Sequence, residues 1–241
     1  MSTTAPSTQQ AEVNHSARFA ERLNWLRAGV LGANDGIVSV AATVVGVAAA
    51  TNTVTPVLIA GVAAVLAGAL SMALGEYVSV SSASDSQRSV IRKLRRELKH
   101  DPAAAKLALR DAYLSQGLTP TTAELVAAEL TEKNPIASHL TTRFHLAEDE
   151  VLSPWHAAIA SGISFLAGAA LPLATILLAP LQWRIPVTFA AVLVALALTG
   201  GLGAMLGRSP VAPAVIRVVL GGVLALAATW AVGSLLGVSV A

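Results

Sequence analysis

Three side chains able to bind a metal ion lie within long apolar stretches of this sequence. Asp35 lies in LGANDGIVSV (31–40), and Met72 and Glu76 lie in LSMALGEYVSV (70–80). A helix would place Met72 and Glu76 on one face, because they are four residues apart. Carboxylates suit Mn²⁺ and Fe²⁺, whereas a thioether favours softer ions. The residue types therefore predict a path for divalent cations, and the same carboxylates could couple cation movement to a proton gradient.

The elements that position these side chains are expected to cross a membrane. The chain of 241 residues is 54% hydrophobic and only 12% charged, with a mean hydropathy of +0.66. Soluble domains carry about 25% charged residues. There is no cysteine, which excludes disulfides, thiolate metal sites and cysteine nucleophiles. The sequence also lacks a phosphate-binding glycine loop and a metal-hydrolase histidine pair, so we expect a protein that is not an enzyme, needs no cofactor and binds no nucleic acid.

Five apolar runs have roughly the 20 residues that a membrane helix needs. They predict an all-α membrane protein with spans near 27–50, 56–80, 155–179, 185–207 and 213–238. An inward N-terminus puts 15 of the 16 lysines and arginines on the cytosolic side and leaves only Arg184 outside. This distribution follows the positive-inside rule and predicts a cytosolic N-terminus. A bacterial inner membrane and an organellar membrane both remain open.

The segment between the second and third spans differs in composition from the spans. Residues 81–154 hold ten acidic and ten basic residues. Four N-capping residues are each followed by proline, which suits the first helical position: Asp101-Pro102, Thr119-Pro120, Asn134-Pro135 and Ser153-Pro154. The pattern predicts helices near 84–100, 102–116, 120–133 and 135–146, with Gly117 as a stop. We therefore divide the chain into a disordered tail (1–17), two spans (18–80), a cytosolic helical domain (81–154) and three spans (155–241).

Asp35 and Met72 are expected at similar depths in the membrane. Asp35 lies eight residues beyond Arg27, about 12 Å, and Met72 lies nine residues from the cytosolic end of its span, about 13 Å. Structural explanations compete with a cation site. A carboxylate can pair with a buried base, a methionine can simply pack, and Glu76 can extend to the headgroups beside Tyr77. Small residues beside Asp35, including Gly32 and Gly36, would allow close helix approach.

Two long motifs resemble the vacuolar iron transporter family, of the calcium cross-complementer and nodulin-like type. They are LRAGVLGANDGIVSVAATVVGVAAA and LAGALSMALGEYVSVSSASDSQRS, and SGISFLAGAALPL resembles the family's third span. The resemblance, to a bacterial-type member, implies a five-span homodimer with its pore at the dimer interface. It implies export of Fe²⁺, and in some members Mn²⁺, from the cytosol in exchange for protons. The family's pore aspartate and methionine fall on Asp35 and Met72, and its motif glutamate falls on Glu76.

The cytosolic domain departs from the family pattern of metal-gathering glutamates. Glu97 is retained, but Leu94 replaces its partner and alanines stand at three further acidic positions: Ala103, Ala105 and Ala108. The family's paired methionines fall on Thr141 and Thr142, and a following glutamate falls on His145. His145, and less directly His100 or His139, are candidate substitute ligands. These departures leave two alternatives to metal export: a transporter of a different solute, or a membrane scaffold that does not transport.

Overall fold

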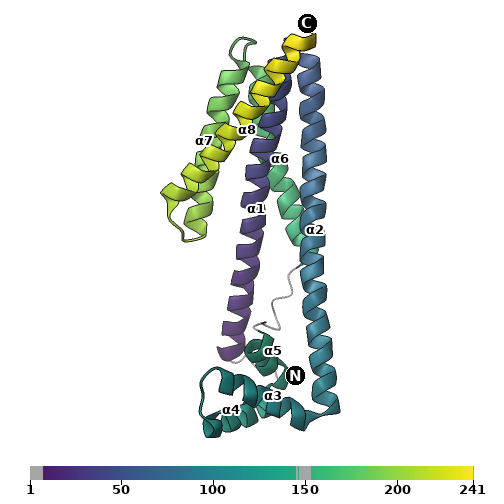
Figure 1. The fold of residues 1–241 in the computed structure, drawn as a ribbon, viewed down its shortest axis with the longest axis vertical. Helices are drawn as coiled ribbons and strands as arrows, with labels where there is room; N and C mark the ends of the chain where they lie inside the picture. The colour runs from purple at the N-terminus through teal and green to yellow at the C-terminus, as the bar shows by residue number, and fades with distance from the viewer. Residues whose placement is uncertain (1–7, 145, 147–152, 241) are drawn as a thin grey trace, which may run out of the picture. The chain divides into compact units, whose positions relative to one another are not determined.

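The computed structural model describes residues 8–144, 146 and 153–240, with side chains for residues 25, 27–144, 146 and 153–237. The described residues contain eight helices and no strand, so the all-α prediction is confirmed for them (Figure 1). The helices are α1 (Thr8–Ala50), α2 (Val54–His100), α3 (Pro102–Ser115), α4 (Pro120–Lys133), α5 (Pro135–Phe144), α6 (Pro154–Leu178), α7 (Arg184–Leu206) and α8 (Val211–Val240).

The chain forms two compact units. The described parts of Arg22–Val78 and Pro154–Ala241 form one unit, here called the bundle. The described parts of Met1–Glu21 and Ser79–Ser153 form the other, here called the helical unit. Both α1 and α2 contribute residues to each unit.

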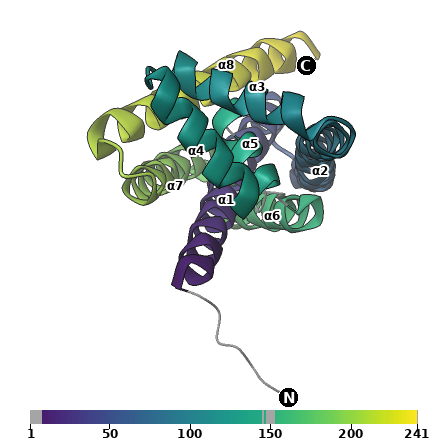
Figure 2. The same ribbon diagram turned by 90° about the horizontal axis from the view of Figure 1, so that it is seen from below.

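Helix α1 is central to the bundle (Figures 1 and 2). Val40, Val44 and Val45 on α1 are completely buried. The buried core residues around them come from the other four helices: Val57 of α2, Phe165, Ala169 and Ile176 of α6, Val192 and Leu196 of α7, and Leu226 of α8. The residues of α1 are therefore held from several sides at once.

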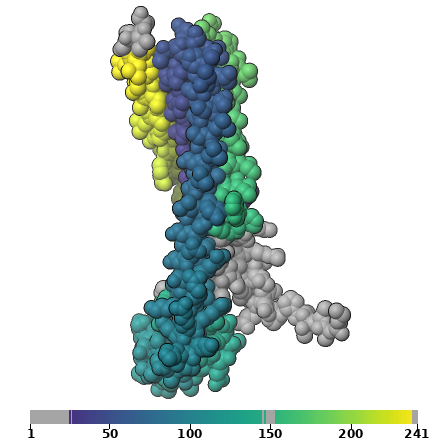
Figure 3. Space-filling view, turned by 90° about the vertical axis from the view of Figure 1, so that its right-hand side faces the viewer, coloured from purple at the N-terminus to yellow at the C-terminus, as the bar shows by residue number. Residues whose placement is uncertain are grey.

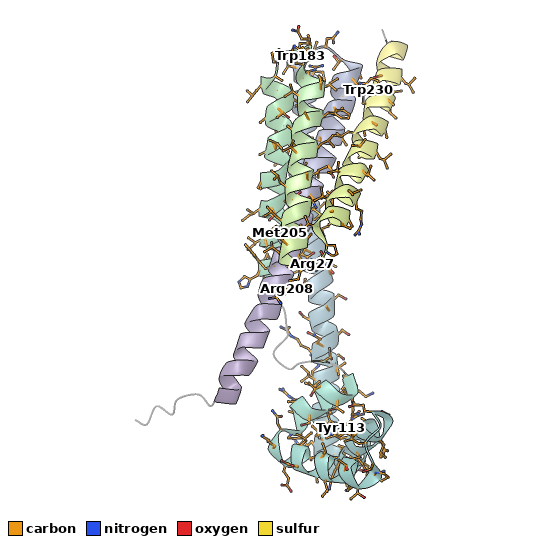
Figure 4. The ribbon with its side chains drawn as sticks, turned by 90° about the vertical axis from the view of Figure 1, so that its left-hand side faces the viewer. Arg27, Tyr113, Trp183, Met205, Arg208 and Trp230 are labelled. Carbon is orange, nitrogen blue, oxygen red and sulfur yellow. The ribbon has the colours of Figure 1, made fainter. Side chains whose placement is uncertain are left out.

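The outer surface of the bundle is more apolar than a soluble protein would tolerate. Helix α2, which runs along the surface in Figure 3, exposes an apolar residue every four positions: Leu58, Val62, Leu66, Leu70, Leu74 and Val78. Among the described residues, five helices are long and apolar enough to cross a membrane, and each overlaps one of the five predicted spans. Exposed tryptophans Trp183 and Trp230 lie toward one end of the bundle, and Arg27 and Arg208 lie toward the other (Figure 4). Trp155, which packs against Tyr77 near the Arg27 end, is exposed as well, and aromatic residues at both ends of a bundle are typical of helices in a bilayer.

The helical unit contains three short helices, α3, α4 and α5 (Figure 2), and side chains cap the starts of these helices. Asp101 accepts a hydrogen bond from the Ala104 amide at 2.9 Å, and Asn134 accepts one from the Ala137 amide at 3.1 Å. The predicted starts at Pro102, Pro120, Pro135 and Pro154 are confirmed. Gly117, with a φ of 95°, follows α3 as predicted. Leu109, Ala127 and Leu140 contribute the buried contacts between α3, α4 and α5.

Two boundaries differ from the prediction. A span near 56–80 and a separate helix near 84–100 were expected, but α2 is one helix of 47 residues. The intervening SVSSASDSQ contains neither proline nor glycine, so nothing in it interrupts the backbone hydrogen bonds. Helix α1 begins at Thr8, inside the segment predicted as a disordered tail (1–17). Residues 1–7 of that tail lie outside the described residues.

Helix α6 contains a proline in its C-terminal third. Pro172 is buried and has no backbone N–H, so it cannot donate the helical hydrogen bond to the carbonyl of Gly168. Gly168 itself packs against the α1 backbone, where an added Cβ would come within 2.2 Å of the Ala33 carbonyl oxygen. The missing hydrogen bond therefore lies at the contact between α6 and α1.

Candidate functional site

Asp35 lies on the one side of α1 that the bundle leaves partly open. Leu31 and Ser39, one turn before and one turn after it, are both exposed, and Asp35 itself is half-buried. The Ser39 hydroxyl donates a hydrogen bond to Asp35 Oδ1 at 2.6 Å. Among the described residues, no lysine or arginine lies within 4 Å of this carboxylate. A neutral hydroxyl therefore orients the carboxylate and leaves its negative charge uncompensated.

Two glycines hold the Asp35 region of α1 against α6. A Cβ added to Gly32 would lie 2.5 Å from the Ser161 carbonyl oxygen, and one added to Gly36 would lie 2.2 Å from the Phe165 carbonyl oxygen. Both obstacles are backbone atoms of a packed helix, which cannot turn aside as a flexible side chain can. The glycines next to Asp35 thus allow the close approach that the sequence predicted.

Two contacts set the register between α1 and α2. Arg27 contacts Glu76 near one end of the bundle, and a Cβ at Gly61 would meet Val44 Cγ1 at 2.9 Å farther along. Because the helices run in opposite directions, Asp35 falls level with about residue 69 of α2. Met72 then lies about 4.5 Å nearer the Arg27 end. The side chain of Met72 is half-buried and packs against the hydrophobic core, which fits a packing role as well as a lining role.

Glu76 is engaged by a cation from its own chain. Its Oε1 lies 3.4 Å from Nη2 of Arg27, and the Glu76 side chain is only 11% exposed, against 64% for Arg27. Tyr77 beside it packs its ring 4.9 Å from that of Trp155, at the centroids. A metal ion binding Glu76 would therefore compete with the Arg27 guanidinium.

Glu97, in the helical unit, is likewise paired with an arginine. Its Oε2 lies 3.5 Å from Nη1 of Arg143, and the same Nη1 lies 3.1 Å from Nδ1 of His139. His139 is completely buried, and its Nε2 has no hydrogen-bond partner among the described residues. Burial lowers the pKa of His139 below its usual 6.5, the positive charge of Arg143 lowers it further, and Glu97 partly opposes both effects. The imidazole is therefore neutral at pH 7.

The helical unit shows no assembled metal site in its described part. No three histidine, aspartate or glutamate side chains of the described residues come together in a way that could hold a metal ion. His100 is exposed at the end of α2. His145, the other candidate ligand, lies outside the described residues. The side chains that do gather around Glu97 are an arginine and a neutral histidine, which is a poor arrangement for collecting cations.

Sequence reasoning missed the partners of these carboxylates. Arg27 and Glu76 are 49 residues apart, and Glu97 and Arg143 are 46 apart. Ser39 was the most accessible to prediction, because a serine four residues after an aspartate faces it on a helix. Arg184, expected at a membrane edge, is only 4% exposed. Its guanidinium donates hydrogen bonds to the Ala48 carbonyl, at 2.9 Å, and to the Thr51 carbonyl, and so caps the end of α1.

Comparison with known proteins adds evidence from outside the structure. Residues 26–234 match the model of the VIT family. A protein named vacuolar iron transporter from Acanthamoeba castellanii is 39% identical over 212 residues, which cover 88% of this chain and 78% of that protein. Vacuolar iron transporter homolog 4 of Arabidopsis thaliana is 36% identical over 91% of this chain and 87% of its own length. Vacuolar iron transporter homolog 1 of Oryza sativa subsp. japonica is 37% identical over 91% of this chain and 77% of its length.

Proposed function

The chain belongs to the VIT family, whose members are transporters rather than enzymes, and from that premise we propose that it exports Fe²⁺ from the cytosol in exchange for protons. It is an integral membrane protein with several apolar helices. Transport of Mn²⁺ by the same route is part of the proposal, because both ions accept carboxylate ligands. The N-terminus and the helical unit are assigned to the cytosol, on the strength of the basic residues that lie there.

The observation that carries the proposal is the state of Asp35. A carboxylate about 12 Å beyond Arg27 along a membrane helix costs free energy, and such groups are usually functional. The structure supplies Asp35 with a hydroxyl but no described counter-ion. A divalent cation or a proton would neutralise the same charge. Alternate occupation by metal and by proton is the elementary requirement of an exchanger.

The other residues receive roles that follow from their positions. Met72, about one turn nearer the Arg27 end, provides a thioether contact that favours Fe²⁺ over harder ions. Glu76 is the carboxylate at the cytosolic mouth, where an arriving metal ion displaces Arg27. In a homodimer, a two-fold axis facing the open side of α1 would bring two copies of Asp35 together. The proposed pore then lies between two chains rather than inside one.

One observation favours a weaker role for the helical unit than in metal-gathering relatives. Glu97 is paired with Arg143, and no cluster of candidate ligands is present among the described residues. A transporter of another solute, with a degenerate metal-gathering domain, would share this feature. A non-transporting scaffold is less well supported, because it gives no reason to retain an uncompensated Asp35.

Uptake into proteoliposomes tests the proposal. The purified full chain is reconstituted, and Fe²⁺, Mn²⁺ and Zn²⁺ are offered separately with and without an imposed pH gradient. We expect Fe²⁺ uptake that requires the gradient and falls to the level of empty liposomes in Asp35→Ala. Asp85→Ala, which removes an exposed aspartate from α2, is the matched control and should transport normally. Uptake of Fe²⁺ by Asp35→Ala at the wild-type rate would overturn the proposal.

A further inference from the structure

A hollow of about 420 Å³ lies in the bundle, on the side of α1 away from α6. Residues of α1, α7, α8 and the turn between α7 and α8 line it, among them Arg27, Val30, Asn34, Thr199, Gly203 and Ala214. Small residues of α7 create the space. A Cβ at Gly203 would already meet Val30 at 3.1 Å. A volume of this size is in the range of sites for small organic ligands.

The hollow is apolar along its length and polar only at its ends. At its inner end, the Thr199 hydroxyl donates a hydrogen bond to Asn34 Oδ1. Arg27 and Ser209 lie at the other end. Along α1, Arg27 is about 10 Å from Asn34. Leu31 and Leu206 on the rim are each about half exposed, at 49% and 48%. The hollow therefore opens onto the apolar outer surface of the bundle.

A second arginine stands at the charged end. Figure 4 shows Arg208 near Arg27, at the same end of the bundle. Arg208 lies in the turn between Gly207 and Ser209, both of which line the hollow. Its φ is 50°, the only positive value at a non-glycine residue in the described chain. Glycine is the usual residue at a positive φ, because a side chain there raises the conformational energy of the backbone. Arg208 accepts this cost and places a positive charge at the opening of the hollow.

We propose that the hollow binds an anionic phospholipid of the surrounding bilayer. The phosphate lies between Arg208 and the exposed guanidinium of Arg27, and one acyl chain follows the apolar groove toward the Asn34–Thr199 pair. Arg27 is engaged by Glu76, and its side chain is 64% exposed, so it adds positive charge at the opening while Arg208 is the main contact of the phosphate. Basic pockets between membrane helices on the cytosolic side are suited to anionic headgroups. The proposal depends on the groove and its charges and not on the metal that is transported.

Lipid fits this groove better than a soluble ligand does. The lining belongs to candidate membrane spans, so in a bilayer the groove would open toward hydrocarbon. A polar molecule would leave its hydrogen-bonding groups without partners along the middle of the groove, where the lining side chains are Val30, Ala204 and Val218. A lipid places its one charged group at the arginines and its apolar chain against these residues. The arrangement of charge and apolar surface thus matches the two parts of a phospholipid.

Native mass spectrometry of the purified full chain tests this site. The protein is titrated with phosphatidylglycerol and, separately, with phosphatidylcholine. We expect one phosphatidylglycerol retained per chain in preference to phosphatidylcholine. Arg208→Gln should weaken its binding about fivefold, because a juxtamembrane arginine contributes about 1 kcal/mol to anionic-lipid attraction, whereas Arg208→Lys should retain most of it. Ala214→Phe should abolish the binding by filling the groove.

Two variants distinguish the site from general lipid attraction. Arg217→Gln removes an exposed base of α8 that does not line the hollow, and Ala212→Phe enlarges an exposed alanine in the same turn as Ala214. Both should bind phosphatidylglycerol as the wild type does. Equal retention of the two lipids, or equal weakening by Arg217→Gln and Arg208→Gln, would overturn the proposal.

A second copy of the chain is the competing occupant of the groove. The sequence contains no cysteine, so Ala214→Cys provides a single thiol for crosslinking in membranes. We expect lipid-facing reactivity at this thiol, with labelling by a membrane-soluble maleimide and no crosslinked dimer. Efficient disulfide formation between two Cys variants would show that the groove is covered by protein and would overturn the lipid assignment.

Discussion

The bundle and the helical unit each contain a carboxylate suggested as a metal ligand, but they hold it in different ways. Asp35 accepts a hydrogen bond from the neutral Ser39 hydroxyl at 2.6 Å. Glu97 faces the positive Arg143 guanidinium at 3.5 Å. The residue types suggested the same chemistry for both positions. Their partners make Asp35 available to a cation and make Glu97 already neutralised.

The two carboxylates also differ in how rigidly they are held. Asp35 stands on a helix enclosed by its neighbours and fixed by glycine contacts to the α6 backbone. Glu97 stands on a half-exposed stretch of α2, with 36% of its side chain accessible. A half-buried carboxylate held in a fixed position, with no charged partner among the described residues, is a suitable place for a cation to bind. A half-exposed carboxylate beside an arginine forms an ordinary ion pair of the kind that contributes little to stability.

The largest expected effect comes from breaking the packing that fixes Asp35. In Gly36→Val the added side chain meets the Phe165 carbonyl oxygen, so α1 and α6 must separate. We expect a loss of at least about 1–3 kcal/mol of stability, the usual cost of overpacking, together with loss of Fe²⁺ uptake. Thermal unfolding in detergent and proteoliposome uptake measure the two effects.

Gly75→Val is the matched control for this change. Gly75 lies on α2, and a Cβ built there meets nothing within 4 Å. The same substitution should therefore leave both the unfolding temperature and uptake close to those of the wild type. Equal losses in the two variants would mean that valine in any span is harmful and that the α1–α6 contact has no special importance.

A smaller effect is expected from removing the arginine that is paired with Glu97, so that this carboxylate, like Asp35, has no charged partner among the described residues. Arg143→Gln removes the counter-ion of Glu97, and the freed carboxylate should bind Mn²⁺ up to about fivefold more tightly, in line with the small free energy of exposed ion pairs. Calorimetric titration of the full chain in an Asp35→Ala background measures this change without the proposed pore site. Arg110→Gln separates the pair between Arg110 and Asp111, at 2.7 Å, and serves as the control. The same gain in both variants would show that Glu97 has no special affinity for metal.

The smallest expected effect is a dependence of the helical unit on pH. Because the pKa of buried His139 is lowered, the unfolded chain binds more protons than the folded chain once the pH falls below about 6.5. Stability is therefore full above that value and is lost as the pH falls, by at most about 1.4 kcal/mol per pH unit. Hydrogen exchange of α5 in the full chain at pH 7.5 and 5.5 measures the loss. His139→Leu should reduce it, and His100→Leu, at an exposed position, should not; an unchanged pH dependence in His139→Leu would refute the assignment.

Much of the fold followed from local sequence patterns. Five apolar runs became five candidate spans, and capping residues followed by proline marked the starts of α3, α4, α5 and α6. These features depend on neighbouring residues, so they can be derived without knowing the tertiary structure. The prediction ended the second span at residue 80 and began a new helix at 84, whereas α2 continues through residues 81–84. The predicted break was placed at the expected membrane boundary, although no residue there interrupts a helix.

The partners of the charged residues could not be derived in this way. Composition places an arginine near each end of a span, but it does not say that Arg27 reaches Glu76 or that Arg184 turns inward to cap α1. These contacts depend on helix register and on the angle at which helices pack, which the apolar pattern leaves open. The same limit applies to His139, which sequence alone offered as a possible ligand and which the structure buries beside an arginine.

Pro172 gives α6 a point of low bending stiffness opposite the part of α1 that carries Asp35. The Gly168 carbonyl lacks its helical partner whether α6 is straight or bent, so bending there breaks no backbone hydrogen bond. The part of α6 before Gly168, with Ser161 and Phe165 against the two glycines, can therefore tilt as a unit relative to the part after Pro172. In the proposed exchange of Fe²⁺ for protons, Asp35 has to face two aqueous compartments in turn, and a flexible point in α6 at this depth would allow that change.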